Sequence, residues 1–326
     1  MVGFDIDNFN GSARIDSLEY KRVNQPLQKV NFINLNAYSK NKTRNIILES
    51  DLINAEVRGD FILKELVHTG EKMLHDLLPL YFEKEKDTIA KQEFIFRIDF
   101  LQPEIITSLF APDVIISKGW IKGEFKSESD KLRIKLKNDR LGYQNFYLKG
   151  LDLDATKEPG SPMFFDLKSA DLMIDSLAFS SDISFNGSAF NNSISYKLKA
   201  SERDNRHALS TSGELSFDTT IIDLIIGESD IFLLNEKWYL DSLAYVSYSE
   251  EKLTIQNFVL QQDKQLLRAN GTIGRSEDNS LKINTQRFKL STLNNVIESE
   301  EIKLFGLANG DINISNFFNT PYITAD

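Results

Sequence analysis

Apolar and polar residues alternate along most of the chain with a period of two. The first long runs of alternating residues are Ala55, Val57, Gly59, Phe61 and Leu63, and then Phe94, Phe96, Ile98 and Phe100. Successive side chains of a strand point to opposite faces, so this alternation predicts half-buried strands. In residues 131–137, three apolar residues interleave with three lysines and one arginine. One apolar and one charged face on the same strand exclude a sheet that is buried on both sides.

The alternation continues toward the end of the chain. Its later pairs are Tyr196 and Leu198, Leu215 and Phe217, Leu253 and Ile255, Leu281 and Ile283, and Ile312 and Ile314. Short polar segments at 127–130, 202–206 and 276–279 predict hairpins, so neighbouring strands are expected to pair antiparallel. At Gln256 and Asn257 the alternation slips by one residue, which predicts a β-bulge.

Helical spacing interrupts the strands in three places. Residues 65–80 carry leucines and a methionine at helical spacing, and Pro79 supplies a stop, so a helix is predicted there. Two shorter helical turns belong to a repeated pattern of a phenylalanine, an apolar turn and two glycines four residues apart. The first copy runs through Phe100, Ile105, Ile106, Leu109, Phe110, Gly119 and Gly123, and the second through Phe288, Leu293, Val296, Ile297, Gly306 and Gly310. Glycines on a strand predict a close approach of two backbones or a bend in the sheet.

These patterns together predict a mainly β fold. We expect an elongated, curved antiparallel sheet that forms a trough, of the kind called a β-taco or repeating β-groove, with a few short helices. The expected segments are 1–101 with the helix near 65–80, then 102–287, and the truncated start of a further segment at 288–326. Because the strand pattern runs to the last residues, we expect the chain to be a piece of a longer protein.

Composition narrows the classes of partner. The chain has 326 residues, a formal net charge of −10 and a pI near 5.0. Nucleic acid and anionic membranes would be repelled by this charge, and the sequence itself displays no basic patch. The chain has no cysteine, so packing alone must hold the fold. Its first ten residues do not resemble a signal peptide, and no apolar run reaches the ~18–20 residues that a membrane helix requires.

A search for catalytic or metal-binding chemistry finds little. His68 and His75 lie seven residues apart on the predicted helix, but no third zinc ligand accompanies them. Asp152 and Asp154 share one strand face, and a solvated charged face explains them better than an acid and base pair. The chain has no nucleophile elbow, phosphate-binding loop or HExxH motif. The sequence therefore predicts no enzyme, no metal and no cofactor.

The order of these features resembles the TamB group of the AsmA-like repeating β-groove proteins, the inner-membrane components of the translocation and assembly module. The resemblance covers most of the chain. It rests on the two repeat copies, on Glu236, Lys237, Trp238 and Tyr239, on Leu253, Ile255, Asn257, Phe258 and Leu260, and on residues 267–273. We expect the membrane anchor and the carboxy-terminal domain of that group to lie outside this chain, as in a piece from the middle of a longer protein.

The resemblance implies a periplasmic lipid-transfer segment. In a full-length protein anchored in the inner membrane, an apolar groove would carry phospholipid toward the outer membrane. A role in outer-membrane biogenesis and protein assembly would involve a TamA-like outer-membrane partner, contacted through parts outside this chain. No nucleic acid partner is implied. The residues expected to contact lipid are Phe94, Phe96, Ile98, Phe100, Leu132, Ile134, Leu136, Tyr196, Leu198, Leu215 and Phe217.

The alternative is a structural or adhesive module without a lipid ligand. In a β-sandwich or closed solenoid, the apolar faces would form an ordinary core. In an adhesive or glycan-binding module, Trp238 and Tyr239 would be exposed and would stack on sugar rings.

Overall fold

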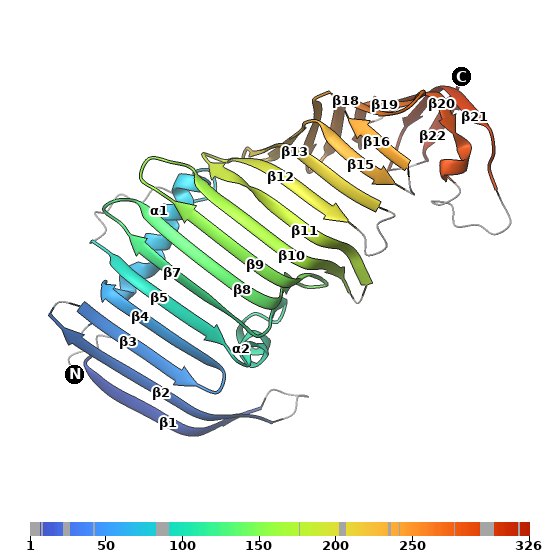
Figure 1. Cartoon of the computed structure of the whole chain (residues 1–326). Coiled ribbons are helices and arrows are strands. Elements are labelled where there is room, and N and C mark those ends of the chain that lie inside the picture. Colours follow the sequence, from blue (N-terminus) through green and yellow to red (C-terminus); the bar gives the residue numbers. More distant parts are fainter. Residues whose placement is uncertain are drawn as a thin grey trace. The chain divides into compact units, whose positions relative to one another are not determined.

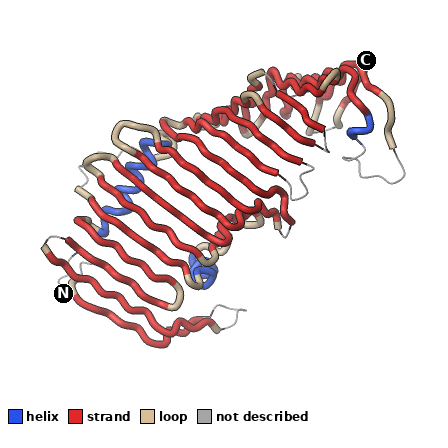
Figure 2. Tube along the Cα trace, viewed as in Figure 1, coloured by secondary structure: helices blue, strands red, loops and turns tan. Residues whose placement is uncertain are grey.

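The computed structural model describes residues 7, 9–21, 27–41, 43–82, 91–175, 177–201, 207–233, 236–240, 242–276, 278–293, 303–318 and 320–326. The hairpin predicted at 202–206, together with Val296 and Ile297 of the second repeat copy, lies outside these residues. Strands account for 69% of the structure and helices for 9%, so the prediction of a mainly β chain with few short helices is confirmed (Figure 2).

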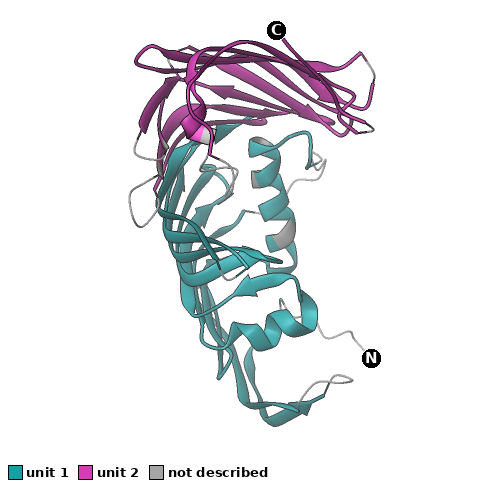
Figure 3. Ribbon diagram, turned by 90° about the vertical axis from the view of Figure 1, so that its right-hand side faces the viewer, with its two compact units in different colours: residues 1–191 teal, residues 192–326 magenta. Residues whose placement is uncertain are grey.

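The chain divides into two compact units. Unit 1 comprises Met1–Asn191 and unit 2 comprises Asn192–Asp326 (Figure 3). The segment boundaries expected near 101 and 287 both fall inside these units. In each unit, every strand pairing described below is antiparallel, as the hairpin signals predicted.

Unit 1 is a meander. Its strands are β1 (Gly11–Tyr20), β2 (Gln28–Lys40), β3 (Thr43–Ser50), β4 (Ile53–Asp60), β5 (Glu93–Phe100), β6 (Val114–Ile116), β7 (Gly119–Lys126), β8 (Lys131–Tyr143), β9 (Phe146–Lys157), β10 (Met163–Ile174) and β11 (Leu177–Phe190) (Figure 1). Neighbours in sequence pair with each other, except that β5 pairs with β7, while β6 and β7 lie end to end against β8. Local pairing of this kind follows from the short polar turns between strands.

Two helices lie on the same side of the sheet of unit 1 (Figure 3). Helix α1 (Leu66–Leu77) follows the 3-10 turn η2 (Leu63–Glu65), which confirms the helix predicted at 65–80, and α2 (Pro103–Phe110) is the helical turn of the first repeat copy. The Asp7 carboxylate accepts a hydrogen bond from the backbone N–H of Leu63 at 2.6 Å and pairs with Arg44 at 3.1 Å. A carboxylate at this position satisfies N–H groups that the start of a helix leaves without partners.

Unit 2 is a second meander. Its strands are β12 (Ser193–Ser201), β13 (His207–Phe217), β14 (Ile221–Ile226), β15 (Ser229–Leu233), β16 (Glu236–Leu240), β17 (Ala244–Ser249), β18 (Lys252–Gln262), β19 (Gln265–Gly274), β20 (Ser280–Lys289), β21 (Leu307–Ser315) and β22 (Tyr322–Ala325), with a 3-10 turn η3 (Leu290–Leu293) after β20. Strands β14 and β15 both pair with β13, and β16 and β17 both pair with β18. Each of these pairs acts as one interrupted strand.

The sheet of unit 2 curls tightly around the buried side chain of Trp238. Strand β16 is separated from β20 by β18 and β19, a distance of ~14 Å at ~4.8 Å per strand if the sheet were flat. The rings of Trp238 and Phe288 are nevertheless only 6.0 Å apart, and Lys289 pairs with Glu236 at 2.9 Å. Trp238, Leu240, Ala244 and Phe288 are all buried, so the inside of the curl is packed at this end.

The predicted bulge is confirmed, and the repeat is confirmed in part. Asn257 has a φ of 53°, and the pairing of β18 with β19 shifts between Ile255 and Phe258. In the first repeat copy Phe100 pairs with Gly119, whereas in the second Phe288 pairs with Ala308, after a register shift in β20. The two copies therefore share the order of strand, helical turn and strand, but they differ in register.

Gly123 fits the predicted close approach. A Cβ atom at Gly123 would lie 2.6 Å from the carbonyl oxygen of Arg133 and 2.6 Å from the ring of Phe96. We therefore expect Gly123→Ala to lower the free energy of unfolding by ~1–3 kcal/mol, the usual cost of overpacking. Gly70 in α1 has nothing within 4 Å of its Cβ position, so Gly70→Ala should raise the free energy of unfolding by ~0.5–1 kcal/mol. Urea unfolding of both variants measures this, and a shift of the same sign in both would contradict it.

Candidate functional site

One face of unit 1 carries a continuous apolar row across ten strands. Residues directly opposite in antiparallel strands point to the same side, so the register identifies the members of the row. They are Ala13, Leu35, Leu48, Ala55, Ile98, Ile121, Leu136, Leu153, Leu167 and Phe185. Every member lies on the face that the alternating pattern makes apolar.

A second row lies two residues further along each strand. It contains Gly11, Ala37, Ile46, Val57, Phe96, Gly123, Ile134, Ala155, Phe165 and Gly187. Large and small members are interspersed, and the ring of Phe96 occupies the space beside Gly123 that a side chain would fill. We call these two rows together the apolar face of unit 1.

The larger side chains of the apolar face are half-buried. Phe96, Ile98, Ile134, Leu136 and Phe165 are all partly accessible to solvent. Figure 3 shows a single layer of strands in unit 1, with α1 and α2 as the helices that lie against it. An ordinary core would bury such side chains, so the face retains apolar surface that another molecule can cover.

Helix α1 covers one margin of this face. Beneath it, Phe94 contacts Phe61 and Phe125 with ring centroids 5.8 and 5.5 Å apart. Phe61 and Phe125 are buried, and Leu132 beside them is buried as well. At the same margin, Lys157 is buried in an ion pair with Asp130. These groups form a packed core under the helix.

The predicted lipid-contacting residues thus fall into different environments. Phe96, Ile98, Ile134 and Leu136 lie on the half-exposed rows, and Phe100 lies at the far end of β5, opposite Gly119. Phe94 and Leu132 belong to the packed margin under α1. Tyr196, Leu198, Leu215 and Phe217 lie together on one face of unit 2.

Unit 2 has an apolar row of its own. It runs through Ile194, Leu215, Leu224, Val246, Ile255, Gly271, Leu281, Ile314 and Ile323. Tyr196 lies opposite Gly213, with its hydroxyl 2.9 Å from the Cβ position of that glycine. Burial raises the pKa of the Tyr196 hydroxyl. An aromatic ring across from a glycine therefore occurs on the faces of both units.

Several members of these rows were absent from the sequence-based selection. Ile121, Leu153, Leu167, Phe165 and Phe185 lie directly in register with the predicted residues. Each stands in an alternating run, so the pattern carried the signal for a strand face. The pattern does not give the pairing register of the strands, which decides which apolar residues lie opposite each other.

The opposite face of unit 1 is charged. Lys135 pairs with Asp154 at 2.6 Å, and Lys137 pairs with Asp152 at 2.9 Å, so both aspartates are partners in cross-strand ion pairs rather than an acid and base pair. On β5, the hydrogen bond and charge of Lys126 lower the pKa of Glu93. These ion pairs are exposed to solvent, so each contributes little to the stability of the fold. Opposite charges on neighbouring strands nevertheless favour this pairing register.

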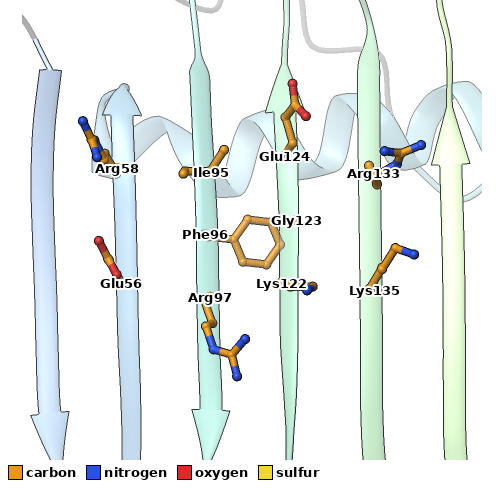
Figure 4. A pocket seen from close by; sticks show the side chains of 10 residues that line it. All are labelled: Glu56, Arg58, Ile95, Phe96, Arg97, Lys122, Gly123, Glu124, Arg133 and Lys135. Atoms are coloured by element: carbon orange, nitrogen blue, oxygen red, sulfur yellow. The ribbon is translucent and has the colours of Figure 1, made fainter.

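A basic patch interrupts this pattern of paired charges. A depression of about 350 Å³ on the charged face is lined by five basic side chains and two acidic ones from β4, β5, β7 and β8 (Figure 4). The basic residues are Arg58, Arg97, Lys122, Arg133 and Lys135, and the acidic ones are Glu56 and Glu124. We call these seven residues the basic patch. The interpretation that the chain has no basic patch is therefore wrong, because residues from four strands assemble one.

Trp238 is only 4% exposed, which corrects the interpretation that it is available for sugar stacking. Its neighbour Tyr239 points to the other face and is 44% exposed, with the Lys237 ammonium 4.7 Å from its ring centroid. The two rings therefore do not form one stacking surface.

The described residues contain no group of three or more potential metal ligands. His68 contacts Glu71, and His75 Nδ1 lies 2.5 Å from the carbonyl oxygen of Phe82. Among the helices of the described part of the chain, none is long and apolar enough to cross a membrane. Comparison of the chain with protein-family models, with curated proteins and with solved structures yields no match.

Proposed function

We propose that the chain carries the acyl chains of phospholipids on the apolar faces of its sheets. The observation that supports this most is the pair of ten-strand rows in unit 1, whose larger side chains are half-buried on a single layer of strands. Such a face is long, continuous and chemically uniform. It suits a flexible apolar chain better than a compact polar substrate, which would need convergent polar groups.

Moving a phospholipid through water exposes its acyl chains, which costs free energy. Two acyl chains of ~16 carbons, at ~0.8 kcal/mol per CH₂ group, would lose about 25 kcal/mol if they crossed water bare. Contact with an apolar face along the whole path removes most of this cost. No catalytic group is needed, so the proposal is that the protein is not an enzyme and acts without a cofactor.

The wider setting of the proposal follows the resemblance to repeating β-groove proteins. We propose a place in the periplasm, in a protein anchored in the inner membrane, which passes phospholipid toward the outer membrane and contributes to its biogenesis. A TamA-like outer-membrane protein would be contacted by parts outside this chain. The packed interior around Trp238 then marks one end of unit 2 where an acyl chain would have no room.

Native mass spectrometry of the full chain tests the proposal. We expect phospholipid to co-purify with the protein, and chloroform extraction to release it. Delipidated protein should take up a lipid with a fluorescent acyl chain from vesicles. If the protein is isolated without lipid and takes up none from vesicles, the proposal is wrong, and the apolar faces serve only as an ordinary core.

A further inference from the structure

The basic patch places like charges directly opposite each other. In the register of β5, β7 and β8, Arg97 lies across from Lys122, and Lys122 lies across from Lys135. Like charges in directly opposite positions destabilise a sheet, whereas opposite charges stabilise it. The neighbouring Lys137 lies opposite Asp152, a residue of opposite charge. The like charges that face each other in the patch therefore differ from the charge pairing next to it.

The charges of the patch are only partly balanced by the protein. Arg97 is neutralised by Asp99, to which it donates three hydrogen bonds, and Lys135 is neutralised by Asp154. Arg58, Lys122 and Arg133 make no ion pair within the described part of the chain, although Lys122 lies 4.9 Å from the ring centroid of Trp120. Glu124 faces Arg133 in the register but pairs with Lys126 at 3.5 Å.

The geometry allows these side chains to converge. Figure 4 shows them on adjacent strands, on the side of the sheet away from α1, which passes behind the strands. Adjacent strands are ~4.8 Å apart and β5 lies between β4 and β7, so Arg58 on β4 and Arg133 on β8 start ~14 Å apart, with Lys122 on β7 between them. One anionic group between the two arginines can be reached by all three side chains when they extend toward it. Ile95, Phe96 and Gly123 also line the depression, and none of them carries a charge.

We infer that the basic patch binds a phosphate-bearing group. Arg97 and Lys135 are already paired with Asp99 and Asp154, so the basic side chains left for a ligand are Arg58, Lys122 and Arg133. A phosphate monoester carries about −1.5 to −2 at pH 7 and has three acceptor oxygens, which can accept hydrogen bonds from all three. Guanidinium groups also match the geometry of phosphate oxygens. The phosphate could be carried by a lipid headgroup or by a soluble compound. This site lies on the face opposite to the apolar rows, so it does not depend on the proposed lipid carriage.

The test measures binding of pyrophosphate to the full chain by titration calorimetry at low ionic strength. We expect the triple variant Arg58→Gln, Lys122→Gln, Arg133→Gln to bind at least tenfold more weakly than the wild-type protein. The matched control is Lys197→Gln, Lys199→Gln, Lys264→Gln, which changes the net charge equally at exposed positions of unit 2. This control should bind pyrophosphate as the wild type does.

A second arm distinguishes the two sources of phosphate. Phosphatidylcholine vesicles with and without phosphatidic acid are sedimented with the protein. The source is a lipid headgroup if the protein sediments with the phosphatidic acid vesicles, if pyrophosphate competes with this binding, and if the triple variant of Arg58, Lys122 and Arg133 (the patch variant) does not bind. Binding of pyrophosphate without retention on vesicles supports a soluble phosphate. No binding of either probe by the wild type, or equal weakening in patch variant and control, would overturn the inference.

Discussion

Phe165→Glu is expected to reduce the lipid bound per molecule at least tenfold, while Phe164→Glu leaves it unchanged. The two phenylalanines are neighbours on β10, but they point to opposite faces. Phe165 lies in the second apolar row between Ala155 and Gly187, 5.2 Å from the ring of Phe185. Phe164 lies on the charged face and is 54% exposed. A carboxylate without a partner in the path of an acyl chain costs more than the ~1.4 kcal/mol that a tenfold loss represents.

Uptake of a fluorescent-chain lipid from vesicles measures this effect, with circular dichroism to establish that both variants fold. Phe96→Glu and Ile134→Glu test the same face at β5 and β8 and should also block uptake. Truncation of any single row residue to alanine should change uptake little, because contact with an acyl chain is shared over many strands. Equal uptake by Phe164→Glu and Phe165→Glu would count against the apolar face as the lipid path.

Trp238→Ala is expected to lower the free energy of unfolding of unit 2 by ~3–5 kcal/mol, the usual cost of truncating a buried large aromatic residue. Trp238 is 4% exposed and contacts Phe288 across the curl of the sheet, so its removal leaves a cavity where β16 and β20 meet. Its indole nitrogen is buried without a hydrogen-bond partner among the described residues, so the expected loss comes from packing and not from a broken hydrogen bond.

Guanidinium unfolding followed by far-ultraviolet circular dichroism measures this loss. Trp238→Phe is the control, and it should lose clearly less because a ring still fills most of the space. Tyr239→Ala, on the other face of the same strand, should cost under about 1 kcal/mol, as surface substitutions usually do. A loss for Trp238→Ala no larger than that for Tyr239→Ala would show that the curl does not depend on this contact.

Much of the fold follows from local pattern. The alternation around Phe96 and Ile134, the helix after Leu66 and the bulge at Asn257 are all properties of neighbouring residues, so the sequence displays them directly. The same holds for the charged face, where Lys135 and Lys137 stand between apolar residues. Phe96, Ile98, Ile134 and Leu136 of the candidate site were found for this reason.

The remaining features depend on which residues lie opposite each other. The aromatic cluster of Phe61, Phe94 and Phe125 forms because α1 lies against that margin, which placed Phe94 in a packed core. The residues next to Trp238 do not indicate that it is buried, and only the curl of unit 2 brings Phe288 against it.

By itself, then, the sequence determined the strands, their two unlike faces and their local order, because side-chain direction along a strand depends only on neighbouring residues. Only the tertiary structure decided how the apolar rows align and where the sheet of unit 2 curls around Trp238. It also decided that basic residues from four strands form one patch. Register and curvature set distances between residues far apart in the chain, and those distances determine burial and charge density.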